Sequence, residues 1–258
     1  MPVPQAEPLA HAVSARAAAL LDNPIWHSLR THHAAIALGD DRARRYPSHI
    51  GPLSGIPAQD PHHYAALAAL APADIVALFS LEPFRVPGHW TQLRMQPIVQ
   101  MIRPAGAPAL DLHLTPGAPG LDSETWEAKQ QLRPLTPADA PQMVALAELT
   151  EPGPFRLRTI ELGGFYGIFE GHRLLSMAGR RMRLPGLIEV SGVCTHPDAR
   201  GRGYAAFLMS RVIQEIEREG NTAFLHAFAG NPAIRIYERL GFTLRQTFHC
   251  AVLKPNAQ

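Results

Sequence analysis

Two glycines that stand one residue apart, Gly201 and Gly203, most constrain what this chain can fold into. They follow an apolar stretch at residues 187–193 that predicts a strand, and they precede residues 204–219, where apolar side chains recur at helical spacing. Glycines allow the backbone to turn several N–H groups to one side, and a helix start adds partial positive charge. The sequence therefore predicts a concave site for phosphate oxygens between a strand and a helix.

The well-known phosphate-binding motifs do not match this turn. A P-loop requires Gly-Lys-Ser/Thr and a dinucleotide fingerprint requires G-x-G-x-x-G, and residues 200–205 contain neither. The string alone is a weak signal of phosphate binding. Whether residues 200–205 bind phosphate therefore depends on the strands and helices predicted around them.

The second half of the chain alternates predicted strands and helices. Strands are predicted at residues 131–135, 165–169, 174–182, 187–193, 223–228 and 243–253. Helices are predicted at residues 136–148, 204–219 and 232–240, the last capped by Asn231 and ended by Gly241. This order predicts an α/β (or α+β) fold with a mixed sheet and helices on both faces.

Two motifs in this half resemble those of one superfamily. Residues 187–205, read as Leu-Ile-Glu-Val-Ser-Gly-Val-Cys-Thr-His-Pro-Asp-Ala followed by Arg-x-x-Gly-x-Ala, resemble the acetyl-CoA signature of the GNAT superfamily of N-acetyltransferases. Residues 231–242 are similar to its second motif, and the FR47-like branch is the most similar. The resemblance covers about residues 130–255. It implies the GNAT fold, acetyl-CoA as co-substrate, and transfer of its acyl group to an amine by direct attack in a ternary complex.

The resemblance also implies where the cofactor lies. The strand at residues 187–193 is expected to splay from that at residues 223–228, with the pantetheine arm in the gap and bonded to the backbone of Val193 and Thr195. The residues implied in acetyl-CoA binding are Val193, Cys194, Thr195, Arg200, Gly201, Arg202, Gly203, Tyr204, Ala205, Asn231 and Tyr237.

The side-chain alternation along the first of these strands is interrupted. Ile188 and Val190 fall on one side and Glu189 on the other, so simple alternation would place Val193 on the polar side. A bulge at Gly192 would correct this, and bulges often lie beside active sites. The alternative is a glycine tolerated in an ordinary strand.

Tyr237 and Glu189 are the predicted catalytic residues. The resemblance assigns Tyr237 to the departing thiolate, although its helical spacing from Ala233 and Leu240 also fits a packing stripe. Glu189 lies eleven positions before Arg200, the offset of the basic glutamate in histone-type members. A shielded carboxylate with a raised pKa would suit a general base; a water relay or a structural glutamate are the alternatives.

Other reactive side chains receive simpler interpretations. Cys194 lacks an identifiable base and is expected to pack. The adjacent pairs His32-His33 and His62-His63 lack the i, i+4 spacing of a metal site, so no metal is predicted. A basic edge could receive an acidic acceptor or merely keep a strand edge soluble; it comprises Arg180, Arg181 and Arg183.

Composition excludes several classes of protein. The chain has 258 residues and two cysteines, Cys194 and Cys250, which predicts no disulfide framework and a cytoplasmic location. No signal peptide or apolar membrane span is predicted, and there is no dense basic face for nucleic acid. The acceptor is expected to be an amine on a small molecule or a peptide. A non-catalytic acetyl-CoA sensor is the alternative function.

The first half of the chain is harder to interpret. Helices are predicted at residues 10–21, 25–37 and 64–70, and strands at residues 75–81 and 91–102. Prolines and glycines crowd residues 103–127, which predicts a linker and two domains, 1–125 and 126–258. The first is expected to be a degenerate GNAT-like lobe that shapes the acceptor pocket or a subunit interface. A homodimer is therefore left open.

Overall fold

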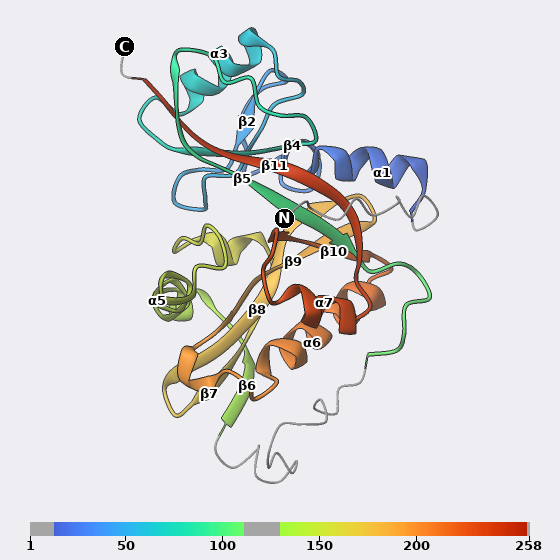
Figure 1. Ribbon diagram of the computed structural model, residues 1–258. Coiled ribbons are helices and arrows are strands. Elements are labelled where there is room, and N and C mark those ends of the chain that lie inside the picture. The colour runs from blue at the N-terminus through green and yellow to red at the C-terminus, as the bar shows by residue number, and fades with distance from the viewer. Residues whose placement is uncertain (1–12, 111–129, 257–258) are drawn as a thin grey trace.

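The computed structural model describes residues 13–110 and 130–256 (Figure 1). Residues 13–110 contain two helices, three very short strands, a third helix and two longer strands. In chain order these are α1 (Ala15–Asp22), α2 (Pro24–Arg30), β1 (Leu38–Gly39), β2 (Arg44–Arg45), β3 (Ser54–Gly55), α3 (Pro61–Leu70), β4 (Val76–Ser80) and β5 (Trp90–Ile102).

Helix α2 is shorter than predicted, because the prediction extended it to residue 37. It ends at Arg30, and the chain then continues through turns. The hydroxyl of Thr31 donates to the carbonyl of His27 over 2.7 Å, and the ring of His33 turns back to the hydroxyl of Ser28 over 3.1 Å. These side-chain hydrogen bonds form where the periodicity predicted that the helix would continue, and the backbone turns there instead.

The second half has the predicted alternation of strands and helices. Its elements are β6 (Gln130–Pro134), the 3-10 helix η1 (Pro137–Asp139), α5 (Ala140–Thr150), η2 (Thr159–Leu162), β7 (Phe165–Glu170), β8 (Arg173–Leu184), β9 (Leu187–Thr195), η3 (Pro197–Ala199), α6 (Tyr204–Arg218), β10 (Thr222–Phe228), α7 (Ile234–Arg239) and β11 (Thr243–Pro255).

One mixed sheet of eight strands joins both halves, in the order β4-β11-β5-β10-β9-β8-β7-β6. Its neighbouring strands are antiparallel except for the parallel pair β9 and β10. The long strand β5 lies between β10 and β11 (Figure 1). The first half of the chain thus supplies a strand that separates the last two strands of the second half.

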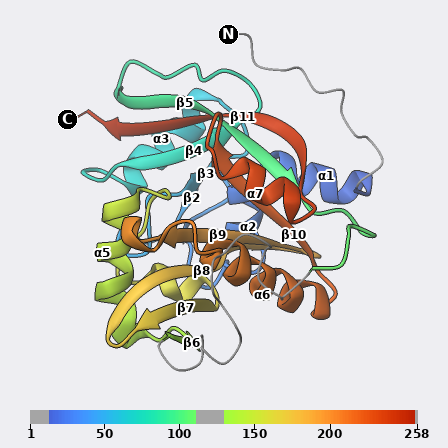
Figure 2. The same ribbon diagram turned by 60° about the horizontal axis from the view of Figure 1, so that its bottom comes forward.

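Helices cover both faces of this sheet, as predicted (Figure 2). On one face the apolar stripe of α6, with Leu208, Val212 and Ile216 fully buried, packs on Ile188 and Val190 of β9. On the other face α1 and α2 pack on the strand residues of a second cluster, and α5 packs on a third. The buried stripe of α6 explains why its amino-terminal end is held against β9.

The two halves share an order of elements. In the first half β1, β2 and β3 form an antiparallel sheet, and a parallel bridge between Leu53 and Ala77 joins the start of β3 to β4. In the second half β7, β8 and β9 are antiparallel and β10 is parallel to β9. That the first half is a degenerate GNAT-like lobe stays a prediction, and the predicted boundary between residues 125 and 126 lies outside the described residues. No helix in the described ranges is long and apolar enough to cross a membrane.

Candidate active site

Strands β9 and β10 run side by side for three residue pairs and then separate. The last pair is Glu189 with Phe224. Beyond it β9 stays with β8 as far as Thr195, whereas β10 pairs with β5 as far as Phe228. The predicted divergence is confirmed. Main-chain groups of β9 that face β10 beyond Glu189 have no partner strand within the described sheet.

A bulge at Gly192 reorients the end of β9. The register against β8 shifts between Met177 and Gly179, and Gly192 has a φ of +63°, a left-handed conformation that favours glycine. Val193 consequently packs in the same cluster as Ile188 and Val190. A Cβ on residue 192 would lie 2.7 Å from Cε1 of Phe165. The predicted bulge is confirmed, and the neighbouring ring leaves room only for glycine.

The turn before α6 is open to solvent. Arg200, Gly201 and Arg202 are exposed, and Gly201 and Gly203 have φ values of +78° and +79°. In the described part of the chain, the amides of Gly201, Arg202 and Gly203 donate no hydrogen bond. The first amides of α6 have no partner within the helix either. The turn therefore presents free N–H groups at a helix start, as an anion site requires.

Tyr204, the first residue of α6, faces inward, whereas its neighbour Ala205 is half-buried. The Tyr204 hydroxyl is buried without a hydrogen-bond partner among the described residues. The ring belongs to the core cluster that holds α6 against the sheet. Tyr204 thus anchors the open turn to the core.

Tyr237 lies on α7, and Asn231 precedes that helix. Asn231 Oδ1 accepts a hydrogen bond from the Ala233 amide over 2.9 Å, but α7 begins at Ile234, later than predicted, so Ala233 and not Asn231 is the cap residue. Tyr237 is 8% exposed and belongs to the α6-side core cluster. Burial, with a smaller contribution from Cys194, raises the pKa of its phenol to about 12, so it stays a proton donor at neutral pH.

The end of β9 also places Cys194 and Thr195. Cys194 is buried, and burial raises the pKa of its thiol to about 12, which agrees with a packing residue and not a nucleophile. The hydroxyl of Thr195 bonds that of Ser176 on β8 over 2.8 Å. These side chains fix the strand from the β8 side and leave its other edge without a strand partner.

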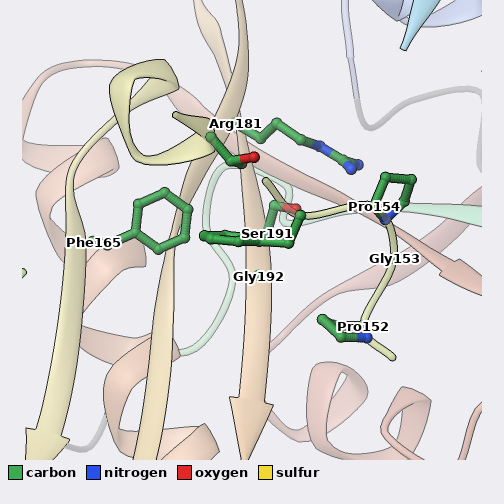
Figure 3. A pocket seen from close by; sticks show the side chains of 9 residues that line it. Pro152, Gly153, Pro154, Phe165, Arg181, Ser191 and Gly192 are labelled. Atoms are coloured by element: carbon green, nitrogen blue, oxygen red, sulfur yellow. The ribbon is translucent and has the colours of Figure 1, made fainter. Parts of the chain in front are cut away.

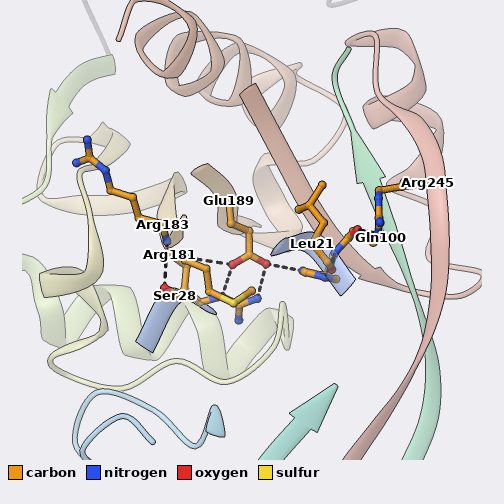
Figure 4. A network of polar contacts seen from close by, with 9 residues as sticks. Leu21, Ser28, Gln100, Arg181, Arg183, Glu189 and Arg245 are labelled. Atoms are coloured by element: carbon orange, nitrogen blue, oxygen red, sulfur yellow. Dashed lines mark hydrogen bonds and ion pairs between the residues drawn. The ribbon is translucent and has the colours of Figure 1, made fainter. Parts of the chain in front are cut away.

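The predicted chemistry of Glu189 is wrong. Its side chain is fully buried, and its carboxylate accepts bonds from Nε and Nη2 of Arg181, each over 2.8 Å, and from Nδ1 of His226, also over 2.8 Å (Figure 4). The Met182 amide adds a fourth bond. Burial alone would raise the pKa of Glu189, but Arg181 and His226 outweigh it and hold the pKa at about 2. A saturated carboxylate that is so weakly basic does not fit a general base.

The polar network continues from His226 into the first half of the chain. Gln100 of β5 donates through Nε2 to Nε2 of His226 over 3.0 Å and accepts through Oε1 from Arg245 (Figure 4). Burial is the main reason that the pKa of His226 is lowered, and a neutral ring with its proton on Nδ1 satisfies both of its contacts. These hydrogen bonds link β9, β10, β5 and β11 next to the point where β9 and β10 separate.

A small pocket opens beside the Gly192 bulge (Figure 3). It is lined by Phe165, Arg181, Ser191, Gly192 and the segment of residues 152–155, which follows α5. Its free volume of about 10 Å³ is room for roughly one water molecule. No sequence pattern had indicated that residues 152–155 would line a pocket. Of the predicted basic edge, only Arg181 lines the pocket, since Arg180 pairs with Glu215 of α6 and with Glu219, which follows that helix.

The adjacent histidines of α3 lie near an acidic side chain. One ligand atom each from Asp60, His62 and His63 lies within 4.8 Å of the others. The i, i+4 spacing considers only the two histidines and does not include Asp60. His63 Nδ1 is already engaged with the carbonyl of Ala58 over 3.0 Å. No role is assigned to this cluster.

A strand pair that separates beside a glycine turn at a helix start is the arrangement that the resemblance to the GNAT superfamily implied. The FR47-like protein family model matches residues 165–251. A GNAT-family protein from Novosphingobium aromaticivorans is 37% identical to the chain, with a TM-score of 0.77, and the alignment covers 92% of this chain and 98% of that one. The chain belongs to the GNAT family.

More distant structures share the fold. A GCN5-related N-acetyltransferase from Kribbella flavida has a TM-score of 0.56 at 16% identity, over 94% of this chain and 96% of that one. A GCN5-related N-acetyltransferase-like protein from Streptococcus suis has a TM-score of 0.51 at 13% identity, over 93% and 98% of the two chains. At such identities only the fold is in common. No curated protein matches the sequence.

Proposed function

We propose that the protein is an N-acetyltransferase that moves the acetyl group of acetyl-CoA to an amine while both substrates are bound. The observation that carries this proposal is the separation of β9 from β10 after three residue pairs, next to the open turn before α6. The unpaired edge of β9 suits the pantetheine arm, which can add hydrogen bonds as an extra strand would. The free amides of residues 201–205 suit the pyrophosphate.

The backbone near the bulge has a role in this proposal. The Val193 amide would donate to the thioester oxygen and stabilise the negative charge that develops there during attack. The acceptor nitrogen forms a bond to the carbonyl carbon, and the bond from that carbon to sulfur breaks. Tyr237, whose phenol stays protonated, donates a proton to the departing thiolate and regains one from solvent.

In this proposal Glu189 does not accept the proton that the amine loses. That carboxylate is enclosed by Arg181, His226 and the Met182 amide. A water molecule therefore takes the proton in this proposal and passes it to solvent. Glu189 instead positions the strands at the base of the separation.

The saturated Glu189 also favours a second candidate, a protein that binds acetyl-CoA without transferring its acetyl group. A thiol-release assay with acetyl-CoA and a panel of amines separates the two functions. A transferase releases free CoA thiol in proportion to acetylated amine. A protein that binds acetyl-CoA by calorimetry and yet releases no thiol with any amine is the non-catalytic alternative.

A further inference from the structure

Two polar groups in the pocket beside the bulge have no partner of their own. Arg181 uses Nε and Nη2 for Glu189, and no described residue accepts a bond from its Nη1. Within the same described part of the chain, the hydroxyl of Ser191 also has no hydrogen-bond partner. Arg181 retains 11% side-chain exposure although it is paired, and its guanidinium extends toward Pro154 in Figure 3. Both groups are therefore available to a ligand.

The pocket is close to electrically neutral. Glu189 balances the charge of Arg181, and burial keeps His226 in its neutral form. Thr159, which also lines the pocket, already donates to the carbonyl of Ile50 over 2.6 Å and accepts from the Arg156 amide over 2.7 Å. No carboxylate is among the lining residues. The free groups thus offer hydrogen bonds to oxygen, while a ligand with a large net charge would be disfavoured.

The same pocket lies beside the proposed position of the thioester. Ser191 and Gly192 line it, and Val193 follows directly. An acceptor in the pocket would therefore have its oxygen near Arg181 and its amine near Val193. A zwitterion combines these groups without net charge.

We propose that the acceptor is a small α-amino acid, whose carboxylate accepts hydrogen bonds from Nη1 of Arg181 and from the hydroxyl of Ser191 while its amino group faces Val193. This inference rests on the proposed acetyl transfer. The amino nitrogen loses one proton to water before attack and a second after it, and the released CoA thiolate gains one. The N-acetyl product carries a net negative charge that the neutral pocket does not match, which favours its release.

A weakly held segment covers this pocket. Residues 152–154 make no hydrogen bond within the described part of the chain, and Gly153 has a φ of +126°. Phe155 contacts Phe165 edge to face, with ring centroids 5.7 Å apart. Displacing such a segment costs no hydrogen bond, so a ligand larger than the present water-sized cavity can enter. The cover still limits the acceptor to a small molecule.

The test compares three acceptors that share a side chain. The common α-amino acids are screened by thiol release, and the best of them is compared with its amide and with the amine that lacks the carboxyl group, at equal concentration of the free amine. Charge-assisted hydrogen bonds predict that kcat/KM for the amino acid exceeds that for the bare amine by about tenfold or more. The amide, which retains one oxygen, is expected to fall between them.

Two variants assign the preference to the pocket. Arg181→Gln combined with Glu189→Gln removes the pair without leaving a buried charge, and Ser191→Ala removes only the hydroxyl. Each should reduce the preference for the amino acid over the bare amine, a ratio measured within one variant, so that a general loss of turnover in that variant does not change it. Arg183→Gln, on the same strand and exposed, is the matched control and should keep the preference. Thermal unfolding of each variant confirms that it is folded; Ser191→Ala serves alone if the double variant is not.

The outcomes separate the two proposals. If the three acceptors are acetylated with equal efficiency, the amino-acid inference is overturned and the transferase function stands. A preference that survives in both variants overturns the assignment to Arg181 and Ser191. If acetyl-CoA binds but no amine releases thiol, the transferase function itself fails, and the inference fails with it.

Discussion

Glu189 of β9 and His226 of β10 are joined by a 2.8 Å hydrogen bond where their two strands stop pairing. Phe224 is the last residue of β10 that pairs with β9, and His226 stands two residues further along. Its ring thus reaches back to Glu189 across the start of the separation. Arg181 holds the same carboxylate from β8. A buried charge pair and a neutral imidazole therefore fix the point from which the two strands diverge.

Replacing Glu189 by glutamine should strongly destabilise the protein. The variant Glu189→Gln leaves the guanidinium of Arg181 buried without its counter-charge, and such losses cost about 3–5 kcal/mol. Urea unfolding at neutral pH measures the change. Glu161→Gln, which breaks an exposed pair with Arg158, is the control and should unfold at the wild-type urea concentration. Equal midpoints for Glu189→Gln and wild type would contradict the role assigned to the pair.

Acid should destabilise the protein through His33. Burial, with smaller contributions from His32 and Arg183, lowers the pKa of His33 to about 4. The unfolded chain, with a pKa near 6.5, binds the proton more readily, so the free energy of unfolding falls as pH drops from about 6.5 toward 4. At pH 5 the protonation of residue His33 in the unfolded chain lowers the free energy of unfolding by about 2 kcal/mol relative to its value at high pH.

The variant His33→Gln isolates that contribution. It should lose less stability than wild type between pH 7.5 and pH 5, when both are unfolded in urea. His62→Gln, at an exposed position, should behave as wild type. Parallel pH profiles for wild type and His33→Gln would show that the burial of this ring does not govern its protonation.

Local patterns predicted some of these features and could not predict others. The bulge at Gly192 followed from the alternation of Ile188, Val190 and Val193 along one strand. The hydrogen bonds that keep Glu189 weakly basic come from Arg181, which lies in a second register shift of β8, and from His226 on another strand. Arg181 is only eight residues from Glu189, but it reaches that carboxylate through the pairing of two strands, and His226 is 37 residues away. A local sequence pattern does not indicate such contacts.

The position of β5 in the sheet could not be predicted from local sequence patterns either. Residues 91–102 predicted a strand correctly, and β5 covers them. Nothing in their alternation indicated that they would pair with both β10 and β11. The turn before α6 was predictable because glycine spacing is a local property. The segment at residues 152–155 was not, because proline and glycine there signal only a loop.

Replacing Tyr237 by phenylalanine should lower turnover without weakening acetyl-CoA binding. The phenol is expected to act only on the departing thiolate, so its loss should reduce kcat by about a hundredfold. Calorimetry measures acetyl-CoA affinity and thiol release measures kcat. Tyr64→Phe, which changes another buried tyrosine in the first half of the chain, is the control and should keep wild-type turnover. An unchanged kcat for Tyr237→Phe would leave this tyrosine as a packing residue only.

A methyl group at Gly201 should weaken acetyl-CoA binding. Alanine disfavours the φ of +78° by about 1–2 kcal/mol, and a turn that relaxes this strain rotates its amides away from the pyrophosphate. The expected loss of affinity by calorimetry is about tenfold, since 1.4 kcal/mol corresponds to that factor. Gly186→Ala is a close match, because Gly186 has a φ of +77° and, like Gly201, no atom within 4 Å of the added Cβ. It lies in the turn between β8 and β9, so it should impose similar backbone strain and leave affinity unchanged. If both variants bind acetyl-CoA equally well, the amides before α6 do not hold its phosphates.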